Sequence, residues 1–475
     1  MICSCKPSQK LEQENEIETR QDVINFLFKD YIGEKPSASF IVIKDGKIKE
    51  NQSFGYADLE HKIPANGETN YRLASVTKQF TAMGILILIH QGKLNYETKL
   101  TEVIPEFPEY GKDITIKNLM SHRSGLQSYT KLYPKDWKKQ IVDEDVLHLL
   151  MKQNSLLFPA NSKFRYSNSG YAVLAKIIER VSGKSFKEFM DIEIFEKLGM
   201  TNSTVYLKDL HIKNRAYGYK LIEREYQNKD QNKWSAIQGD GGIYSSVSDY
   251  AKWDKSLYEE TLISEDLMND AFSKWDKDGK TDGDGYGFGW QIGYKNGKKY
   301  LVHGGSSTGF LNTTLRVPSD KITVVIYTNN GNLGGLRRKA LFLASYFSDG
   351  AVPIPCEILL EKNIMDNGIE SISAKFDQIK SNENKYDISK DGLIRLGFSY
   401  FENEPEKSLK VFELITTEFP DYFGGYYGLA QYYAYKDKGN NKLAIENYKK
   451  VVELNPSNEN RLINRSKRMI EKLSE

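Results

Sequence analysis

YRLASVTKQFTAMGILILIHQG, residues 71–92, carries the clearest helix pattern in the sequence. The pattern turns helical at Ser75, and residues 81–89 are apolar on nearly every side, which predicts a buried helix that ends near Gly92. A second helical stretch runs from 171 to 181. We therefore expect Ser75 to open a helix that lies inside the protein.

Strand patterns flank these helices. Residues 39–43 (SFIVI) are β-branched or aromatic, and the Asp45-Gly46 pair that follows suits a tight hairpin turn. Strand patterns return at 300–303, 313–317 and 322–327. Strands at both ends with helices between them predict an α+β domain, in which helices flank an antiparallel sheet that pairs its N- and C-terminal segments.

The length of the chain allows two domains. With 475 residues, 39% of them hydrophobic, it can bury one large core or two separate cores. The α+β domain is expected over 23–350, and the two prolines of AVPIP (351–355) predict a linker at 351–356. The 66 Lys and Arg residues nearly balance the 64 Asp and Glu residues, and the net charge of +2 gives no reason to expect nucleic acid as a partner.

Residues 357–475 have helical periodicity and a weak internal repeat. Five positions are echoed in order: Leu396, Gly397, Tyr400, Phe412 and Pro420 by Leu429, Ala430, Tyr433, Tyr448 and Pro456. The pattern resembles a tetratricopeptide repeat with a short insertion at 436–441, against which the helical stretch 357–380 is expected to pack. A plain amphipathic bundle is the alternative. Either arrangement can present a surface to a protein partner.

The first 22 residues read as a charged tether, a solvated first helix or an ordinary disordered N-terminus. Residues 2–5 (ICSC) resemble the end of a bacterial lipobox with Cys5 as the lipidated cysteine, so the remnant of a lipoprotein signal is another reading. That reading favours the cell envelope or periplasm, whereas the N-terminus as given favours the cytoplasm. No stretch approaches the roughly 18 to 20 apolar residues of a transmembrane helix.

Cysteine and histidine usage predicts catalysis without a metal. Cys3, Cys5 and Cys356 form neither a disulfide framework nor a metal-ligand cluster. The six histidines show no spacing typical of a zinc site. We expect no structural disulfide, no metal and no cofactor.

Two stretches have the spacing S-x-x-K, and their contexts differ. Ser75 and Lys78 share one face at the start of the predicted buried helix, where the amine can reach the hydroxyl and the helix N-terminus favours negative charge. Ser128 and Lys131 follow a turn-like stretch without such a helix, so Ser128 reads as a loop serine. Ser75 is therefore the candidate nucleophile.

A serine hydroxyl needs a base, and no histidine neighbours Ser75 in the sequence. Lys78 must then act in its neutral form or share the proton with a second group. Tyr166, in Tyr166-Ser-Asn168, can supply that group, because a phenol held between cations can have a lowered pKa. Only this Y-x-N stands directly before a long amphipathic helix; the pattern also occurs at Tyr226, Tyr294 and Tyr327.

His303-Gly-Gly305 ends an apolar strand pattern. Glycines there let a strand approach a ligand closely, and a nearby main-chain N–H can face an oxyanion. His90-Gln-Gly92 has the same spacing but lies at a helix end, where it reads as capping. Taken alone, His303 would be a structural histidine.

In this order, Ser75-x-x-Lys78, Tyr166-x-Asn168 and His303-x-Gly305 resemble the signature of the serine β-lactamase and D-alanyl-D-alanine carboxypeptidase superfamily, in the branch related to class C β-lactamases. Further segments similar to that family lie at 71–75, 119–126, 198–201 and 239–245. The resemblance covers 38–346 and implies the fold of β-lactamases and penicillin-binding transpeptidases, with a helical subdomain beside the sheet.

The resemblance also implies a role for each residue. Ser75 is acylated, Lys78 activates it, and Tyr166 is the general base and acid. Asn168 binds the acyl amide of the substrate. His303 and Gly305, which belong to the third motif, also bind the substrate. The backbone N–H groups of Ser75 and Ser306 form the oxyanion hole.

The expected function is a metal-free serine hydrolase that acts through an acyl-enzyme on an amide, a peptide of D-amino-acid or cell-wall type, or an ester. His303 stands where β-lactamases have a lysine, and histidine is mostly neutral at pH 7, so a fixed charge for a β-lactam carboxylate is missing there. The histidine variant is similar to D-stereospecific peptidases, carboxypeptidases and esterases. A non-catalytic penicillin-binding-like protein whose tail recruits a partner, and a true β-lactamase, are the alternatives.

Overall fold

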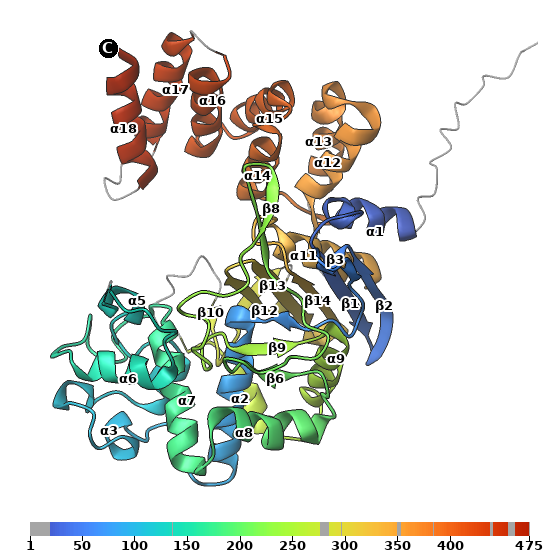
Figure 1. Cartoon of the computed structure of the whole chain (residues 1–475). Helices are drawn as coiled ribbons and strands as arrows, with labels where there is room; N and C mark the ends of the chain where they lie inside the picture. The colour runs from blue at the N-terminus through green and yellow to red at the C-terminus, as the bar shows by residue number, and fades with distance from the viewer. Residues whose placement is uncertain are drawn as a thin grey trace, which may run out of the picture.

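The computed structural model describes residues 20–134, 136–275, 285–295, 297–348, 353–382, 384–437, 440–454 and 461–474. These residues form a large part built on one sheet and a C-terminal helical region that stands above it (Figure 1). Cys3, Cys5 and the lipobox-like start of the chain lie outside the described residues, as does Pro456 of the expected repeat.

A seven-stranded antiparallel sheet organises the large part. Its strands, in spatial order, are β10 (Gly285–Tyr286), β11 (Gln291–Lys295), β12 (Lys298–Ser307), β13 (Phe310–Val317), β14 (Ile322–Thr328), β1 (Ala38–Lys44) and β2 (Lys47–Phe54). Ala38 pairs with Thr328, so the predicted pairing of N- and C-terminal segments is confirmed. Asp45 and Gly46 join β1 to β2 with φ of 52° and 69°, the left-handed pair of a tight hairpin turn.

Both faces of the sheet are covered. Along β1, Phe40 and Val42 pack with helices α1 (Arg20–Phe28) and α11 (Leu336–Phe347), while Ile41 and Ile43 pack with the opposite layer. Because side chains alternate along a strand, this double burial explains the unbroken apolar run FIVI (40–43). The opposite layer contains α2 (Thr77–His90), α9 (Val247–Ser256) and α10 (Glu265–Ala271).

A helical subdomain lies beside the sheet (Figure 1). Its helices are α3 (Leu100–Val103), α4 (Ile116–Met120), α5 (Tyr129–Leu132), α6 (Asp143–Met151), α7 (Asn168–Ser182) and α8 (Phe186–Met190). The predicted buried helix at Ser75 is α2, which ends at His90 before Gly92 in the left-handed conformation. Helix α7 contains the predicted stretch 171–181 and begins three residues earlier than expected. The expected fold class is confirmed.

Short strands complete the large part, and one of them leads to Ser75. Strands β5 (Tyr71–Arg72), β9 (Ile243–Ser245) and β6 (Thr204–Val205) form a small sheet in the order β5-β9-β6. Two further hairpins are β3 (Tyr56–Asp58) with β4 (Ile63–Pro64), and β7 (Tyr219–Ile222) with β8 (Glu225–Asn228).

The C-terminal region is mainly helical in its described residues. It contains α12 (Cys356–Asn367), α13 (Ile372–Lys380), α14 (Lys390–Tyr400), α15 (Pro405–Glu418), α16 (Phe423–Tyr435), α17 (Asn441–Leu454) and α18 (Arg461–Ser474). One hydrophobic cluster joins α12 and α13 to α14 and α15, so the stretch 357–380 packs against the repeat-like helices as expected. Leu396 and Leu429, an echoed pair, occupy corresponding helices α14 and α16.

The segment expected to be a linker contains regular structure. The linker was predicted there because two prolines resist helix and sheet alike, yet Ile354–Pro355 forms β15, which pairs in parallel with β16 (Tyr386–Asp387). The expectation is wrong there because the pairing uses the N–H of Ile354, which donates to the carbonyl of Lys385 at 2.9 Å, and needs none from proline. Cys356 already belongs to α12 and is a buried free thiol.

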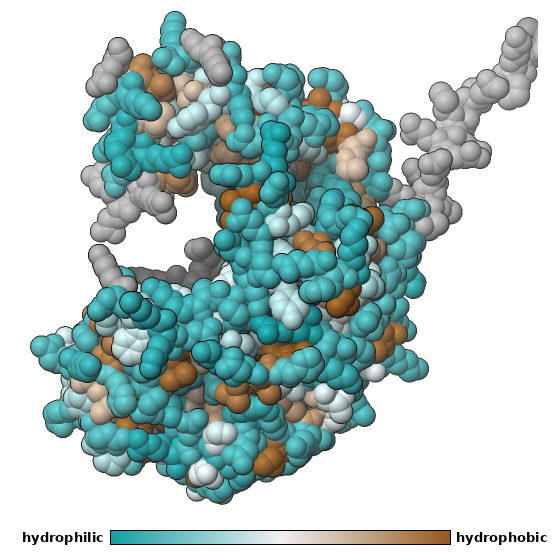
Figure 2. All heavy atoms as spheres, in the orientation of Figure 1, coloured by the Kyte–Doolittle hydropathy of each residue, from teal (hydrophilic) through white to brown (hydrophobic). Residues whose placement is uncertain are grey.

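The surface view shows the C-terminal helices overhanging the helical subdomain, with an open notch between them (Figure 2). In the described ranges, no helix has the length and apolar character that a bilayer crossing requires. Among those same residues, no group of three or more His, Cys, Asp or Glu side chains is placed to hold a metal ion.

Candidate active site

Ser75 lies at the junction between a strand and the buried helix. β5 ends at Arg72, a 3-10 turn spans Ala74–Val76, and α2 follows directly. Ala74 has a φ of 50°, a left-handed conformation that is unfavourable for a residue with a side chain and is found at functional sites. This sharp turn leaves Ser75 half-buried at the start of α2, the position that the sequence predicted.

Strand β12 approaches the turn closely, and Gly305 makes that approach possible. A Cβ atom at Gly305 would lie 2.2 Å from the carbonyl oxygen of Leu73, which no other residue can tolerate. The glycine of the third motif therefore brings β12 against the segment that carries the serine. Ser306, the next residue, lines the same cavities as Ser75.

Lys78 is the second residue of α2, one turn after Ser75, and is fully buried. Its Nζ stands 3.4 Å from Ser75 Oγ and donates to the main-chain carbonyl of Asp240 at 2.7 Å. The ammonium also lies 5.0 Å from the ring centroid of Tyr166 and 5.5 Å from that of Tyr171. The structure thus brings together the serine, the lysine and the tyrosine of the first two motifs.

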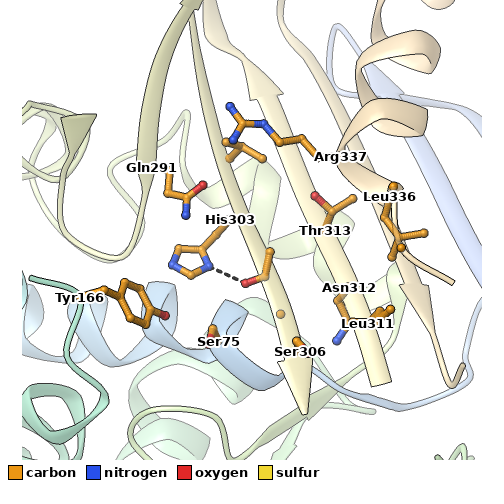
Figure 3. Close-up of a pocket in the computed structure, with 15 residues that line it drawn as sticks. Ser75, Tyr166, Gln291, His303, Ser306, Leu311, Asn312, Thr313, Leu336 and Arg337 are labelled. Carbon is orange, nitrogen blue, oxygen red and sulfur yellow. Dashed lines mark hydrogen bonds between the residues drawn. The ribbon is translucent and has the colours of Figure 1, made fainter. Parts of the chain in front are cut away.

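Tyr166 reaches the site from the segment that precedes α7. Its side chain is 38% exposed, and its hydroxyl points towards Ser75 (Figure 3). The ring of His122 packs against Tyr166 with 4.2 Å between centroids. His122 also accepts from the N–H of Ser167 at Nδ1 and from the N–H of Arg165 at its carbonyl, so it holds the chain on both sides of Tyr166.

His303 is 2% exposed and makes two hydrogen bonds. Nδ1 lies 2.8 Å from the carbonyl of Gly304, the contact dashed in Figure 3. Nε2 lies 3.0 Å from the hydroxyl of Tyr286. A carbonyl can only accept, so Nδ1 carries the proton and Nε2 accepts from Tyr286. Burial and the charge of Lys78 lower the pKa of His303 to about 3, which keeps the ring neutral at physiological pH.

Two cavities meet at Ser75. The larger, of about 490 Å³, is bordered by Tyr166, His303 and Ser306 and extends to Gln291 and Arg337 (Figure 3). The smaller, of about 280 Å³, is bordered by Ser75, Asn168, Tyr129, Trp234 and Asp240. A substrate bound across Ser75 can therefore place one part in each cavity.

Asn168 opens α7 and faces the smaller cavity. Its Oδ1 is buried and has no hydrogen-bond partner among the described residues, so it can accept from a ligand N–H. Asp240 lies nearby and accepts from the hydroxyl of Tyr129 at 2.8 Å. Burial raises the pKa of Asp240, and the charge of Lys78 opposes that rise. This cavity offers acceptors and aromatic walls.

The other sequence matches to the three motifs do not join Ser75, Lys78 and Tyr166. Ser128 precedes the one-turn helix α5, and its hydroxyl contacts that of Thr130 at 2.8 Å. Lys131 is exposed. His90 ends α2, as the capping interpretation expected. The other Y-x-N tyrosines stand in strands: Tyr226 in β8, Tyr294 in β11 and Tyr327 in β14.

Sequence reasoning missed several residues of the site. Arg337, at the start of α11, brings a fixed positive charge to the larger cavity, although none was expected beside His303. Arg337 could not be predicted from the sequence, because it reaches the cavity from a helix that follows the last strand of the sheet. Tyr286 lies in the glycine-rich stretch GYGFGW (285–290), whose alternation of glycine and aromatic residues was a usable signal.

Comparisons with known proteins identify the family of this chain. The Beta-lactamase family model matches residues 24–345. Penicillin-binding protein 4* of Bacillus subtilis (strain 168) is 34% identical over 63% of this chain and 69% of its own. A D-aminopeptidase of Gluconobacter oxydans (strain 621H) is 25% identical over 62% of this chain and 56% of its own.

A solved structure extends the similarity to the fold. The octameric penicillin-binding protein homologue from Pyrococcus abyssi superposes with a TM-score of 0.63 and 26% identity, over 73% of this chain and 80% of that chain. The family match, the curated relatives and the fold lead to the same assignment. The chain belongs to the Beta-lactamase family, within the superfamily of serine hydrolases that includes the penicillin-binding proteins.

Proposed function

We propose that this protein hydrolyses a small amide, peptide or ester through an acyl-enzyme on Ser75. The observation that carries the proposal is the placement of Ser75 Oγ 3.4 Å from the buried ammonium of Lys78, with the Tyr166 ring against that ammonium and a cavity on each side. Nucleophile and proton-transfer groups within reach of each other are the requirement of acyl transfer.

In acylation, Ser75 Oγ attacks the substrate carbonyl and forms the acyl bond as the bond to the leaving group breaks. Tyr166 takes the serine proton and returns it to the leaving group, and Lys78 favours the phenolate that exists in between. A water molecule then attacks the acyl carbon, with Tyr166 as base, and Ser75 recovers its proton. The N–H groups of Ser75 and Ser306 are the proposed oxyanion hole.

The two cavities suggest which part of the substrate binds on each side of Ser75. Asn168 lies in the smaller cavity, where its unpaired Oδ1 suits an acyl-side amide N–H. Tyr166 lines the larger cavity, so the leaving group that it protonates belongs there, near Arg337. His303 and Gly305 form the wall between Ser75 and Arg337. The similarity to a D-aminopeptidase favours peptides or amides of D-amino acids.

Other parts of the proposal concern the whole chain. The similarity to penicillin-binding proteins supports the class C-related branch and a place in the cell envelope, with Cys5 as the proposed lipid anchor. We propose a hydrolase domain over 23–350, a connection at 351–356 and a tetratricopeptide-like region over 357–475. The helical order of α14 to α17 supports the repeat, whose surface would take a protein partner.

A labelling and turnover experiment tests the function. The full-length protein is incubated with a fluorophosphonate and with a fluorescent penicillin, and the labelled residue is identified by peptide mapping. A panel of D- and L-amino-acid amides, a neutral aryl ester and a β-lactam is then compared by kcat/KM. We expect label on Ser75 and faster turnover of a D-amide or ester than of the β-lactam. No label and no turnover would leave the non-catalytic binding protein as the better description.

A further inference from the structure

The C-terminal region contacts the large part through a cluster of four charged side chains, here called the Arg338 cluster. Arg338 donates from Nε and Nη2 to the two carboxylate oxygens of Glu357 at 2.5 and 2.7 Å, and from Nη1 to Asp387. Lys295 Nζ donates to the other oxygen of Asp387 at 2.8 Å. The side chains of Arg338, Glu357 and Asp387 are only 13%, 10% and 11% exposed, so water screens the pairs weakly.

The two carboxylates of the cluster are held in place by the C-terminal region. Asp387 belongs to β16, which pairs with β15. Glu357 lies in the first turn of α12 and against Gly392 of α14, where a Cβ atom would lie 2.6 Å from its Oε2. Burial opposes the charge of Asp387, but Arg338 and Lys295 prevail and lower its pKa, so it stays ionised. A forked, desolvated pairing of this kind fixes geometry well.

The two cations of the cluster belong to elements that border the larger cavity. Strand β11 begins at Gln291, which lines the cavity, and ends at Lys295. Helix α11 begins with Leu336 and Arg337, which also line the cavity, and Arg338 is the next residue. In Figure 3, Gln291 and Arg337 lie at the upper end of the cavity, and Ser75 and Ser306 lie at the lower end.

Other contacts keep the C-terminal region against the same helix. Ile358 of α12 is buried in the cluster of α1, α11 and the sheet, and Glu361 of α12 pairs with Lys29 at 2.6 Å. Helix α11 is therefore enclosed between the sheet and α12. The C-terminal region is part of the support of the cavity wall and not a separate attachment.

We propose that Glu357 and Asp387 are positioning residues for the substrate cavity: by holding Arg338 and Lys295 they fix Arg337 and Gln291 where these bind a carboxylate on the leaving group of the substrate. The chemistry of that end supports this occupant, since a guanidinium and an amide donor face it and no acidic side chain lines the cavity among the described residues. The assignment of the leaving group to this cavity rests on the proposed function.

The experiment uses the full-length protein and a pair of aryl esters that differ only in a carboxylate on the leaving group. Asp387→Asn and Glu357→Gln are compared with Glu418→Gln, which removes the ion pair of Glu418 with Lys380 inside the C-terminal region. We expect KM for the charged ester to rise about 5- to 20-fold in the first two variants, with kcat and the neutral ester changed less than 2-fold. Glu418→Gln should change neither ester, and Asp387→Glu should restore part of the affinity.

A double-mutant cycle shows whether the effect passes through Arg337. Arg337→Ala alone should weaken the charged ester, and adding Asp387→Asn to it should add little, because both changes remove the same contact. Additive effects, or an equal loss for both esters in Asp387→Asn, would overturn the proposal. A stable fold in each variant is checked by thermal melting.

Hydrogen exchange provides a readout that needs no turnover. In Asp387→Asn, the amides of residues 291–295 and 334–340 should exchange faster than in the wild type, while those of α2 keep their protection. Unchanged exchange in both segments would contradict the positioning role even in a catalytically active protein. A chain that shows the faster exchange but never labels Ser75 would instead contradict the proposed function and leave the cluster's structural effect established.

Discussion

Two stretches of the chain share the spacing S-x-x-K, and the structure gives them opposite surroundings. Ser75 opens the long buried helix α2, and the ammonium of Lys78 is enclosed by Asp240, Tyr166 and Tyr171. Ser128 precedes a helix of one turn, its hydroxyl contacts Thr130, and Lys131 is exposed. The difference teaches that a buried cation held against its serine, and not the motif alone, makes a candidate nucleophile.

The largest expected effect comes from the two serines themselves. Ser75→Ala should abolish covalent labelling by a fluorophosphonate, because it removes the hydroxyl that lies 3.4 Å from the buried ammonium of Lys78, and the fold should survive the loss of one half-buried hydroxyl. Ser128→Ala is the matched control and should label like the wild type. A stable covalent adduct on the Ser75→Ala protein would mean that Ser75 is not the nucleophile.

Replacing Lys78 and Lys131 tests whether acylation needs a buried charge beside the serine. Lys78→Met fills the same space without the charge and should lower the acylation rate by roughly 10² to 10⁴ or more, the usual scale for losing proton-transfer help. Lys131→Met should leave the rate unchanged, since its side chain is exposed. Stopped-flow acylation measures both. Similar rates for Lys78→Met and the wild type would mean that the enclosed ammonium is not needed.

Replacing Tyr166 and Tyr294, which share the spacing Y-x-N, tests which tyrosine is the general base. Tyr166→Phe keeps the ring near Lys78 but removes the hydroxyl that points towards Ser75 (Figure 3), and should slow acylation by roughly 10² to 10⁴. Tyr294→Phe changes another Y-x-N tyrosine, in β11, and should be silent. Full activity of Tyr166→Phe would exclude Tyr166 as the base.

The sequence predicts those parts of the fold that are encoded by local periodicity. The hairpin at Asp45-Gly46, the apolar helix from Thr77 to His90 and the strand pair across 318–321 are each visible in a short window. The sequence does not reveal most of the small helices of the subdomain, because four- and five-residue helices such as α4 are stabilised by tertiary packing and capping rather than by periodicity.

The candidate site divides in the same way. Ser75 and Lys78 lie in one turn, so their proximity follows from helix geometry. Tyr286, Arg337 and Asp240 reach the site from three distant elements, and only the three-dimensional fold brings them together. Asp387 is more remote still, because its contact with Arg338 depends on how the C-terminal region packs on α11.

The smallest expected effect is a loss of stability at acidic pH. It arises because His303 is buried in its neutral form near the charge of Lys78. His303 has a folded pKa of about 3 because burial and Lys78 oppose its protonation, against an ordinary value near 6.5. Between these two values the unfolded chain binds a proton that the folded chain does not, so stability falls as the pH falls.

His303 should therefore contribute about 1.4 kcal/mol of lost stability for each pH unit below 6.5. Asp143, whose pKa burial raises to about 7, acts in the opposite direction, but it is present in every variant and cancels in a comparison. Chemical denaturation from pH 7 to pH 4.5 should show a shallower loss for His303→Gln than for the wild type. His61, whose pKa is raised by Asp58, provides the control: His61→Gln should not flatten the curve. Identical pH slopes for His303→Gln and the wild type would mean that His303 protonates freely in the folded protein, and the buried, neutral histidine beside Lys78 would have to be abandoned.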